Sequence, residues 1–233
     1  MTVTSNAVPD TGAPPHPHHT GKHWIDDWRP EDPEFWNTTG RPIARRNLIF
    51  SIFAEHIGFS VWLLWSIVVV QMTAAADGSA AASGWALTTT QALWLVAVPS
   101  GVGAFLRIPY TFAVPVFGGR NWTVISALLL LIPCLLMAWA VGNPEFPFVG
   151  LCLIAATAGF GGGNFASSMA NIAFFFPKAE KGNALALNAG LGNLGVSVMQ
   201  FLVPIVIAAG VFGAMGGAPQ TLTDGGELWM QNA

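Results

Sequence analysis

Residues 90–117 read TQALWLVAVPSGVGAFLRIPYTFAVPVF, an apolar run in which Arg107 is the single charged side chain. An α-helix rises about 1.5 Å per residue, so about 20 residues of this kind cross the roughly 30 Å hydrocarbon layer of a bilayer. Charged residues make up 9% of the whole chain and hydrophobic residues 53%, whereas a soluble domain carries roughly a quarter charged residues. The run is therefore expected to span a membrane as a helix.

Four further stretches have the same character. The five predicted spans cover approximately residues 43–72, 90–117, 122–141, 148–176 and 183–212. A helix satisfies its backbone hydrogen bonds within one segment, as lipid requires. We therefore predict an all-α, polytopic membrane protein. It has a polar, disordered leader over residues 1–42, a five-helix bundle over residues 43–212 and an outward-facing loop over residues 213–233. The leader has no apolar core of a signal peptide.

Lysine and arginine gather on one side of these spans. Five precede the first span, Arg120 lies between the second and third, and Lys178 and Lys181 lie between the fourth and fifth. The connections over residues 73–89 and 142–147 and the tail after residue 212 contain none. Short loops rich in these residues stay in the cytoplasm. This predicts a bacterial inner-membrane protein with a cytoplasmic N-terminus and a C-terminal end on the outer side.

No cofactor or metal site is predicted. The leader contains four histidines whose spacing could catch a metal, but neighbouring prolines hold it extended: His16, His18, His19 and His23. Cys134 and Cys152 fall inside spans, which indicates packing rather than a disulfide. Gly190, Gly192 and Gly195 spell G-x-G-x-x-G within an apolar helix without a preceding strand, so they are interpreted as packing positions and not as a dinucleotide site.

Arg107 lies about ten residues from the cytoplasmic end of its span, hence roughly 15 Å deep. Burying a charge there costs at least roughly 2.5 to 3.5 kcal/mol, so its presence indicates a use for the charge inside the bundle. Phe165 in the fourth span and Asn193 in the fifth lie at a similar depth, roughly 15 to 18 Å. A cation, a ring and an amide at the midplane suit a small anion, and transporters bind substrates at this depth.

Polar side chains at helical spacing are candidates for lining the same cavity. They are Asn164, Ser167, Ser168 and Asn171 in the fourth span, Asn193, Ser197 and Gln200 in the fifth, and Tyr110 beside Arg107 in the second. Interhelical hydrogen bonds and small-residue contacts explain such stripes equally simply. Both interpretations stay open at this point.

Glu55 and His56 place two ionisable side chains in the first span, with Glu55 about 14 Å deep. Glu55 could neutralise Arg107 or bond a neighbouring helix, since unpaired charges in a membrane are costly. Alternatively, Glu55 or His56 could take up a proton together with the anion. The second interpretation would make proton symport feasible.

Residues 161–200 read GGGNFASSMANIAFFFPKAEKGNALALNAGLGNLGVSVMQ. This run resembles the nitrate signature of the nitrate/nitrite porters, the NarK-type transporters of the major facilitator superfamily. The resemblance continues in DWRPEDPEFW (residues 27–36) and LRIPYTFAVPVFGGRNWTV (residues 106–124). It implies the N-terminal part of that superfamily's helical bundle, with five of the usual twelve transmembrane helices.

The resemblance also implies roles for single residues. Arg107 corresponds to the family's substrate arginine, Phe165 to its stacking phenylalanine and Asn193 to its signature asparagine. Ala189 departs from the glycine that is frequent in the family. The first-span string FAEHIGFSVWLLWS (residues 53–66) resembles the sub-type regarded as nitrate/proton symporters, which agrees with a proton role for Glu55.

The function implied is transport of nitrate or nitrite by alternating access, as nitrate/proton symport or nitrate/nitrite antiport, and not an enzymatic reaction. The expected partners are the anion, protons, the bilayer and a C-terminal half that supplies a second arginine and a tyrosine, so the chain is expected to be an incomplete N-terminal fragment. No nucleic-acid partner is expected. The alternative is a membrane-anchoring subunit of a respiratory complex, but the spans contain one histidine and no pair that could ligate haem.

Overall fold

The computed structural model describes residues 25, 27–222 and 225–233. Its long helices are α2 (Arg41–Trp62), α4 (Thr89–Phe117), α5 (Gly119–Leu129), α6 (Leu131–Val141), α7 (Phe148–Phe175) and α8 (Lys178–Ala209). The first span continues beyond α2 through α3 (Leu64–Val68) and the 3-10 helix η2 (Val69–Met72), and α5 and α6 together form the third. Five helical segments of the described chain are thus long and apolar enough to cross a membrane. The predicted all-α, polytopic fold class is confirmed.

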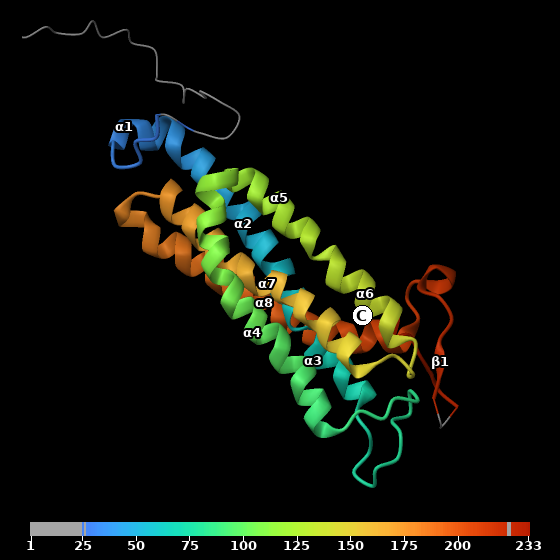
Figure 1. Cartoon of the computed structure of the whole chain (residues 1–233). Helices are drawn as coiled ribbons and strands as arrows, with labels where there is room; N and C mark the ends of the chain where they lie inside the picture. The colour runs from blue at the N-terminus through green and yellow to red at the C-terminus, as the bar shows by residue number, and fades with distance from the viewer. Residues whose placement is uncertain (1–24, 26, 223–224) are drawn as a thin grey trace, which may run out of the picture.

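Helix α7 occupies the middle of the bundle (Figure 1). It packs along α4 and α2 and also contacts α5, α6 and α8, whereas α8 packs chiefly against α2. The glycines of α7 permit this central position. A Cβ at Gly161 would collide with the backbone carbonyl of Gly58 on α2, and one at Gly162 would meet the Trp62 ring and the backbone of Gly103 on α4. Backbones therefore approach closely where α2, α4 and α7 meet.

Two spans that the sequence presents as single helices contain breaks. Between α5 and α6 the helix is interrupted at Leu130, three residues before Pro133. Proline lacks an N–H, and its ring clashes with the carbonyl four residues earlier. In the first span the break lies at Leu63, whose carbonyl accepts bonds from both the N–H and the hydroxyl of Ser66, at 3.0 and 2.6 Å. This three-residue bonding replaces the regular helical bond.

The start of α4 carries the signals of a helix N-terminus. Thr88 Oγ1 accepts from the backbone N–H of Gln91, and Gln91 Oε1 accepts from the N–H of Thr88, a reciprocal capping box. Pro99, Pro109 and Pro115 lie inside this helix without ending it. The Trp62 indole donates to the Pro99 carbonyl over 2.8 Å and so ties α4 to α2.

The disorder predicted for residues 1–42 does not hold for their last part. Residues 33–42 form α1 (Pro33–Phe35), the π-helix η1 (Trp36–Gly40) and the first turn of α2. Trp36 Nε1 donates to Glu180 Oε1 over 2.9 Å, and the Lys178 N–H donates to Glu31 Oε1 over 2.8 Å. The aromatic side chains of this segment thus pack on the α7–α8 turn, contacts that composition does not reveal. The four leader histidines lie outside the described residues.

Helix α8 begins at Lys178, five residues before the predicted start at residue 183. Pro177 precedes it in extended conformation, which suits a helix start. The polar first turn, with Lys178, Glu180 and Lys181, is helical although it lacks the hydropathy of a span. At the other end the tail folds back: β1 (Gln220–Thr221) and β2 (Glu227–Leu228) form an antiparallel pair, followed by η4 (Met230–Asn232).

The tail is joined to α8 and α6. The Trp229 N–H donates to the Ile207 carbonyl over 2.7 Å, and Met230 lies fully buried in the core at this end of the bundle. A further 3-10 helix, η3 (Gly213–Gly216), connects α8 to the pair of strands. A second, smaller core cluster lies around Trp36, Leu48 and Phe176.

Candidate substrate site

Arg107 projects from the middle of α4 toward two aromatic rings. Its guanidinium carbon lies 5.0 Å from the centroid of the Phe165 ring on α7 and 5.6 Å from that of Trp62 on α2. Both distances fall within the range of cation–π attraction. Its Nε donates to the Gly162 carbonyl over a long 3.4 Å. Three helices therefore meet at this side chain, which is half-buried.

Among the described residues, no carboxylate lies at ion-pair distance from Arg107. In the described part of the chain the ion pairs are Arg29–Asp27, Arg29–Asp32 and Arg41–Glu180, all near the N-terminal end of α2. Glu55 and Arg107 therefore do not form a direct ion pair among the described residues. Arg107 still acts on the Glu55 carboxylate through its charge, and Ser168 of α7 and Asn188 of α8 face that carboxylate, as the interpretation of a bond to neighbouring helices expected. A guanidinium has five N–H donors, and the bond to Gly162 uses the Nε donor alone. The remaining donors can bind an anion.

The aromatic wall beside Arg107 includes two residues that sequence reasoning missed. Trp62 is fixed by its bond to Pro99, and Phe59 packs between Trp62 and Phe165 with centroid distances of 5.5 and 6.0 Å. One signal could have drawn attention to Trp62. Tryptophan in membrane proteins is enriched at the interfaces, so one that packs against the arginine of the bundle interior is unusual.

Asn193 lies apart from this pair. It is exposed on α8, and its Nδ2 donates to the Ala189 carbonyl of its own helix over 2.8 Å. Among the described residues, the structure shows no contact between Asn193 and either Arg107 or Phe165. Ser197, one turn further, is exposed as well. This face of α8 is uncovered in the chain, because α8 packs on α2 with the face that carries Gly192 and Gly195.

The polar residues of α7 have two different roles: some join neighbouring helices, and others line a cavity. Asn171 is buried, and its Nδ2 donates to Asn47 Oδ1 on α2 over 3.0 Å. It therefore joins two helices, as the simpler interpretation held. Asn164 is 3% exposed, and neither its amide nitrogen nor its amide oxygen has a hydrogen-bond partner. Ser168 accepts from Asn188 Nδ2 on α8.

Tyr110, one turn beyond Arg107, is buried. Its ring meets the Trp122 ring edge-on at 4.9 Å and covers Gly163 of α7. The hydroxyl has no partner. Tyr110 therefore packs α4 against α5 and α7 and does not contact Arg107 through a hydrogen bond within the residues described.

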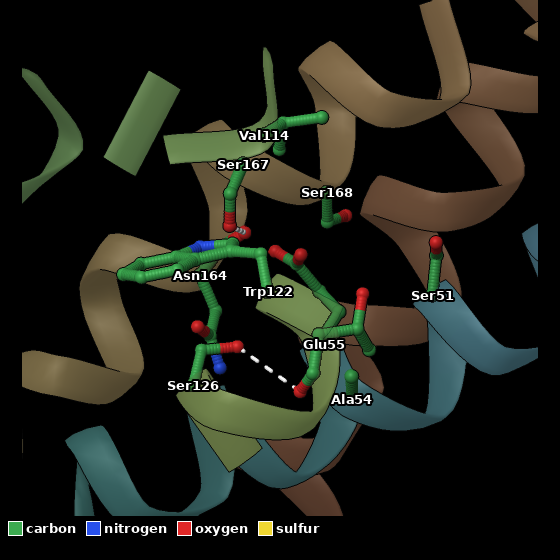
Figure 2. A pocket seen from close by; sticks show the side chains of 10 residues that line it. Ser51, Ala54, Glu55, Val114, Trp122, Ser126, Asn164, Ser167 and Ser168 are labelled. Carbon is green, nitrogen blue, oxygen red and sulfur yellow. Dashed lines mark hydrogen bonds between the residues drawn. The ribbon is translucent and has the colours of Figure 1, made fainter. Parts of the chain in front are cut away.

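Glu55 is 1% exposed. Its carboxylate faces the Ser168 hydroxyl and the Asn188 amide, but among the described residues neither oxygen has a partner in full hydrogen-bond geometry. It lines a small cavity together with side chains of α2, α4, α5 and α7 (Figure 2): Ser51, Ala54, Val114, Trp122, Thr123, Ser126, Asn164, Ser167 and Ser168. A Cβ at Gly192 of α8 would collide with the Glu55 side chain. The Glu55 side chain therefore fits between α2 and α8 only because residue 192 of α8 is a glycine.

His56 is turned toward α8 instead. Its Nδ1 lies 3.1 Å from the Leu191 carbonyl, and its own carbonyl lies 2.7 Å from Ser60 Oγ, which also approaches the Gly195 carbonyl at 3.3 Å. His56 therefore joins α2 to α8. Sequence reasoning had treated Glu55 and His56 alike, but they occupy different surroundings. Within residues 25, 27–222 and 225–233, no group of three or more His, Cys, Asp or Glu side chains could hold a metal ion.

Comparison with known proteins shows relatives over most of the chain. The nitrate/nitrite transporter NarU of Salmonella typhimurium is 50% identical over 214 residues, 91% of this chain. NarU of Escherichia coli is 49% identical over the same share, and the probable nitrate/nitrite antiporter NarK2 of Thermus thermophilus 41% over 90%. The chain spans 44% to 46% of the length of these relatives. No protein-family model matches it.

Proposed function

Because this chain is homologous over 91% of its length to nitrate/nitrite transporters, we propose that it forms the N-terminal part of a carrier of nitrate or nitrite that works by alternating access. The resemblance seen in the sequence and the fold class, an N-terminal helical bundle of the major facilitator superfamily, are thereby confirmed. The single observation that carries the proposal is Arg107, half-buried between two rings without a carboxylate partner.

The chemistry of the guanidinium suits this substrate. Nitrate is planar with three oxygens, and guanidinium is planar with parallel N–H donors, so two donors can reach two oxygens at once. Phe165 would cover the anion or the guanidinium from one side, and Trp62 would hold the arginine in place through its bond to α4. Selectivity then depends on planarity as well as on charge.

A second part of the protein would complete the site. Asn193, Ser197 and Gln200 form a polar face that is exposed on α8 within an apolar span. Polar groups that face lipid are costly, so we propose that a C-terminal half covers this face and brings Asn193 to the anion. We propose that the chain lies in a bacterial inner membrane with its N-terminus on the cytoplasmic side.

For coupling, we propose that Glu55 carries a proton with the anion. The supporting observation is a carboxylate that is 1% exposed and faces only the neutral side chains of Ser168 and Asn188, with no cation at ion-pair distance among the described residues. A charged group in such surroundings is expensive, whereas its protonated form is neutral. Nitrate/nitrite antiport, the activity in the name of one relative, is the alternative.

The experiment is nitrate flux into proteoliposomes that contain the full-length protein. Arg107→Lys keeps the charge and loses the planar fork, so flux should fall by about tenfold or more at subsaturating nitrate. Arg120→Lys, at an exposed position in the first turn of α5, serves as the matched control and should retain normal flux. Normal flux in Arg107→Lys would remove this arginine from the anion site.

A further inference from the structure

The cavity beside Glu55 gathers buried polar atoms that lack partners. They are both carboxylate oxygens of Glu55, the amide nitrogen and oxygen of Asn164, and the indole nitrogen of Trp122. All three residues line the same cavity, and they come from α2, α7 and α5. In Figure 2 the Glu55 carboxylate lies among the side chains of Trp122, Ser167 and Ser168.

Buried polar atoms of this kind need hydrogen-bond partners. A buried polar atom without a hydrogen bond costs roughly 1–3 kcal/mol. The Asn164 amide and the Trp122 indole present three such atoms among the described residues, and the Glu55 carboxylate faces Ser168 and Asn188 without a bond of full geometry. Donors and acceptors are both represented, which is the combination that one water molecule satisfies, since buried waters make about three hydrogen bonds. The cavity has room for about one water.

Hydroxyl groups extend the cavity toward one end of the bundle. Ser126 Oγ donates to the Thr123 carbonyl over 3.2 Å, and Thr123 Oγ1 donates to the Gly119 carbonyl over 2.8 Å. Gly119 is the first residue of α5, and Gly118 alone connects this helix to α4. Ser51 joins the lining from α2, one turn before Glu55. The Thr123 and Ser126 hydroxyls thus donate to backbone carbonyls of α5 and keep their acceptor capacity for the cavity, on the side of α5 that begins next to α4.

We propose that this cavity binds water and forms a proton relay between Glu55 and the α4–α5 connection, within this half of the protein and separate from the anion site. The relay rests on the proposed proton-carrying role of Glu55. In one direction Glu55 gives its proton to the cavity water, and that water passes one of its own protons to the hydroxyls and on to solvent. The reverse transfer reloads the carboxylate.

The lining residues have distinct parts in this relay. A hydroxyl both donates and accepts, so Ser51, Thr123 and Ser126 can pass a proton on. The Asn164 amide and the Trp122 N–H position the water without taking part in transfer. The ring of Phe165 points from the same helix toward Arg107, so the proton and the anion use different surfaces of α7.

The charges around Glu55 come from few elements. Arg107 on α4 acts on the carboxyl at long range, and His56 on α2 is bonded to Leu191 of α8. The side chains that the described parts of α5, α7 and α8 place at Glu55 are neutral: Trp122, Thr123, Ser126, Asn164, Ser167, Ser168 and Asn188. Proton exchange at this carboxyl is therefore controlled chiefly by access of water.

The test uses infrared spectroscopy of the purified full-length transporter in lipid nanodiscs, without nitrate. The carbonyl stretch of the protonated Glu55 carboxyl is identified by its loss in Glu55→Gln and followed against pH. The rate of its shift after transfer to deuterated water then measures access. In Ser126→Val, where methyl groups fill the cavity, the exchange rate should fall by about tenfold. Thr90→Val, at an exposed position in the first turn of α4, should exchange like the native protein.

A second variant guards against misfolding. Ser51→Ala removes a hydroxyl without adding bulk and should slow exchange as well, while circular dichroism reports the helix content of each variant. Native exchange rates in both folded cavity variants, or no Glu55-dependent band at any pH, would overturn the relay. So would a band that responds to Na⁺ at constant pH, because the oxygens would then form a cation site.

The experiments can reject the proton relay and the anion site independently of each other. The infrared band is measured without substrate, so it reports on the cavity whether or not the chain binds nitrate. Conversely, loss of flux in Arg107→Lys with normal exchange at Glu55 would support the anion site alone. Slow exchange in Ser126→Val together with normal flux in Arg107→Lys would leave the relay supported and the anion assignment rejected.

Discussion

The guanidinium of Arg107 lies over the ring of Phe165, with 5.0 Å between the guanidinium carbon and the ring centroid. The two residues are on α4 and α7, helices whose backbones approach closely where Gly103 faces Gly159 and Gly162. The close approach of α4 and α7 thus brings the Arg107 guanidinium and the Phe165 ring to the same level along the bundle. The contact is available to an anion because the guanidinium retains unused donors.

Replacement of Phe165 by leucine should weaken nitrate binding. A cation–π contact is worth about 0.5 to 2 kcal/mol, so the nitrate KM of the full-length transporter should rise by about twofold to thirtyfold. Phe174→Leu, at a position 58% exposed on the same helix, is the matched control. Equal KM values in the two variants would show that the ring has no part in binding.

Glu55→Gln should abolish stimulation of nitrate uptake by an inward proton gradient. Glutamine has the shape of the protonated carboxyl but carries no exchangeable acid proton, so exchange of external for internal nitrate should continue. The measurement is uptake into proteoliposomes with and without a pH gradient. Glu145→Gln, in the connection between α6 and α7, should behave like the native protein. An unchanged response to the gradient in Glu55→Gln would assign coupling to another group.

Gly192→Ala should destabilise the bundle because the added methyl would collide with the Glu55 side chain. Overpacking of this kind costs typically about 1–3 kcal/mol. Gly190→Ala, two residues earlier, meets open space and should instead stabilise the helix by up to about 1 kcal/mol. Unfolding of the chain in detergent micelles, followed by circular dichroism, separates the two. Equal stability of both variants would contradict the packing of α8 on Glu55.

Glu180→Gln should loosen the segment over residues 27–40 without unfolding the bundle. Glu180 accepts from Trp36 Nε1 at 2.9 Å and from Arg41 at 2.7 Å. The charged side chains are 38% and 37% exposed, so the ion pair contributes at most about 1 kcal/mol. Hydrogen exchange of these backbone amides should therefore accelerate by a small factor. Glu34→Gln, an exposed carboxylate in the same segment, should leave the exchange rates as they are.

The rise of a helix per residue predicts how deep a residue lies in the membrane, but not which neighbouring helix its side chain faces. The sequence could therefore predict the depth of the site residues but not which of them meet. Counting residues from the cytoplasmic ends placed Arg107, Phe165 and Asn193 at one level. The structure brings the first two into contact and leaves Asn193 exposed, because the turn of α8 that carries it faces away from α7. Its orientation depends on which face of α8 packs on α2, a property of glycines at positions 192 and 195.

The polar stripe of α7 shows the same limit. Asn164 and Asn171 are seven residues apart and share a face, yet one lines the cavity and the other bonds Asn47. Their partners come from helices distant in the sequence, so spacing could not separate the two roles. Trp122 and Ser126 of the cavity were missed for the same reason: each joins the Glu55 surroundings through packing of α5 on α2 and α7.

The direct backbone contacts among α2, α4 and α7 constrain how the protein can move. Where Gly58 meets Gly161 and Gly103 meets Gly162, no layer of side chains separates the helices that could rearrange to let one slide past another. These three helices consequently behave as one stiff block. In the proposed alternating-access cycle, this block would tilt as a whole when Arg107 is exposed first to one side of the membrane and then to the other.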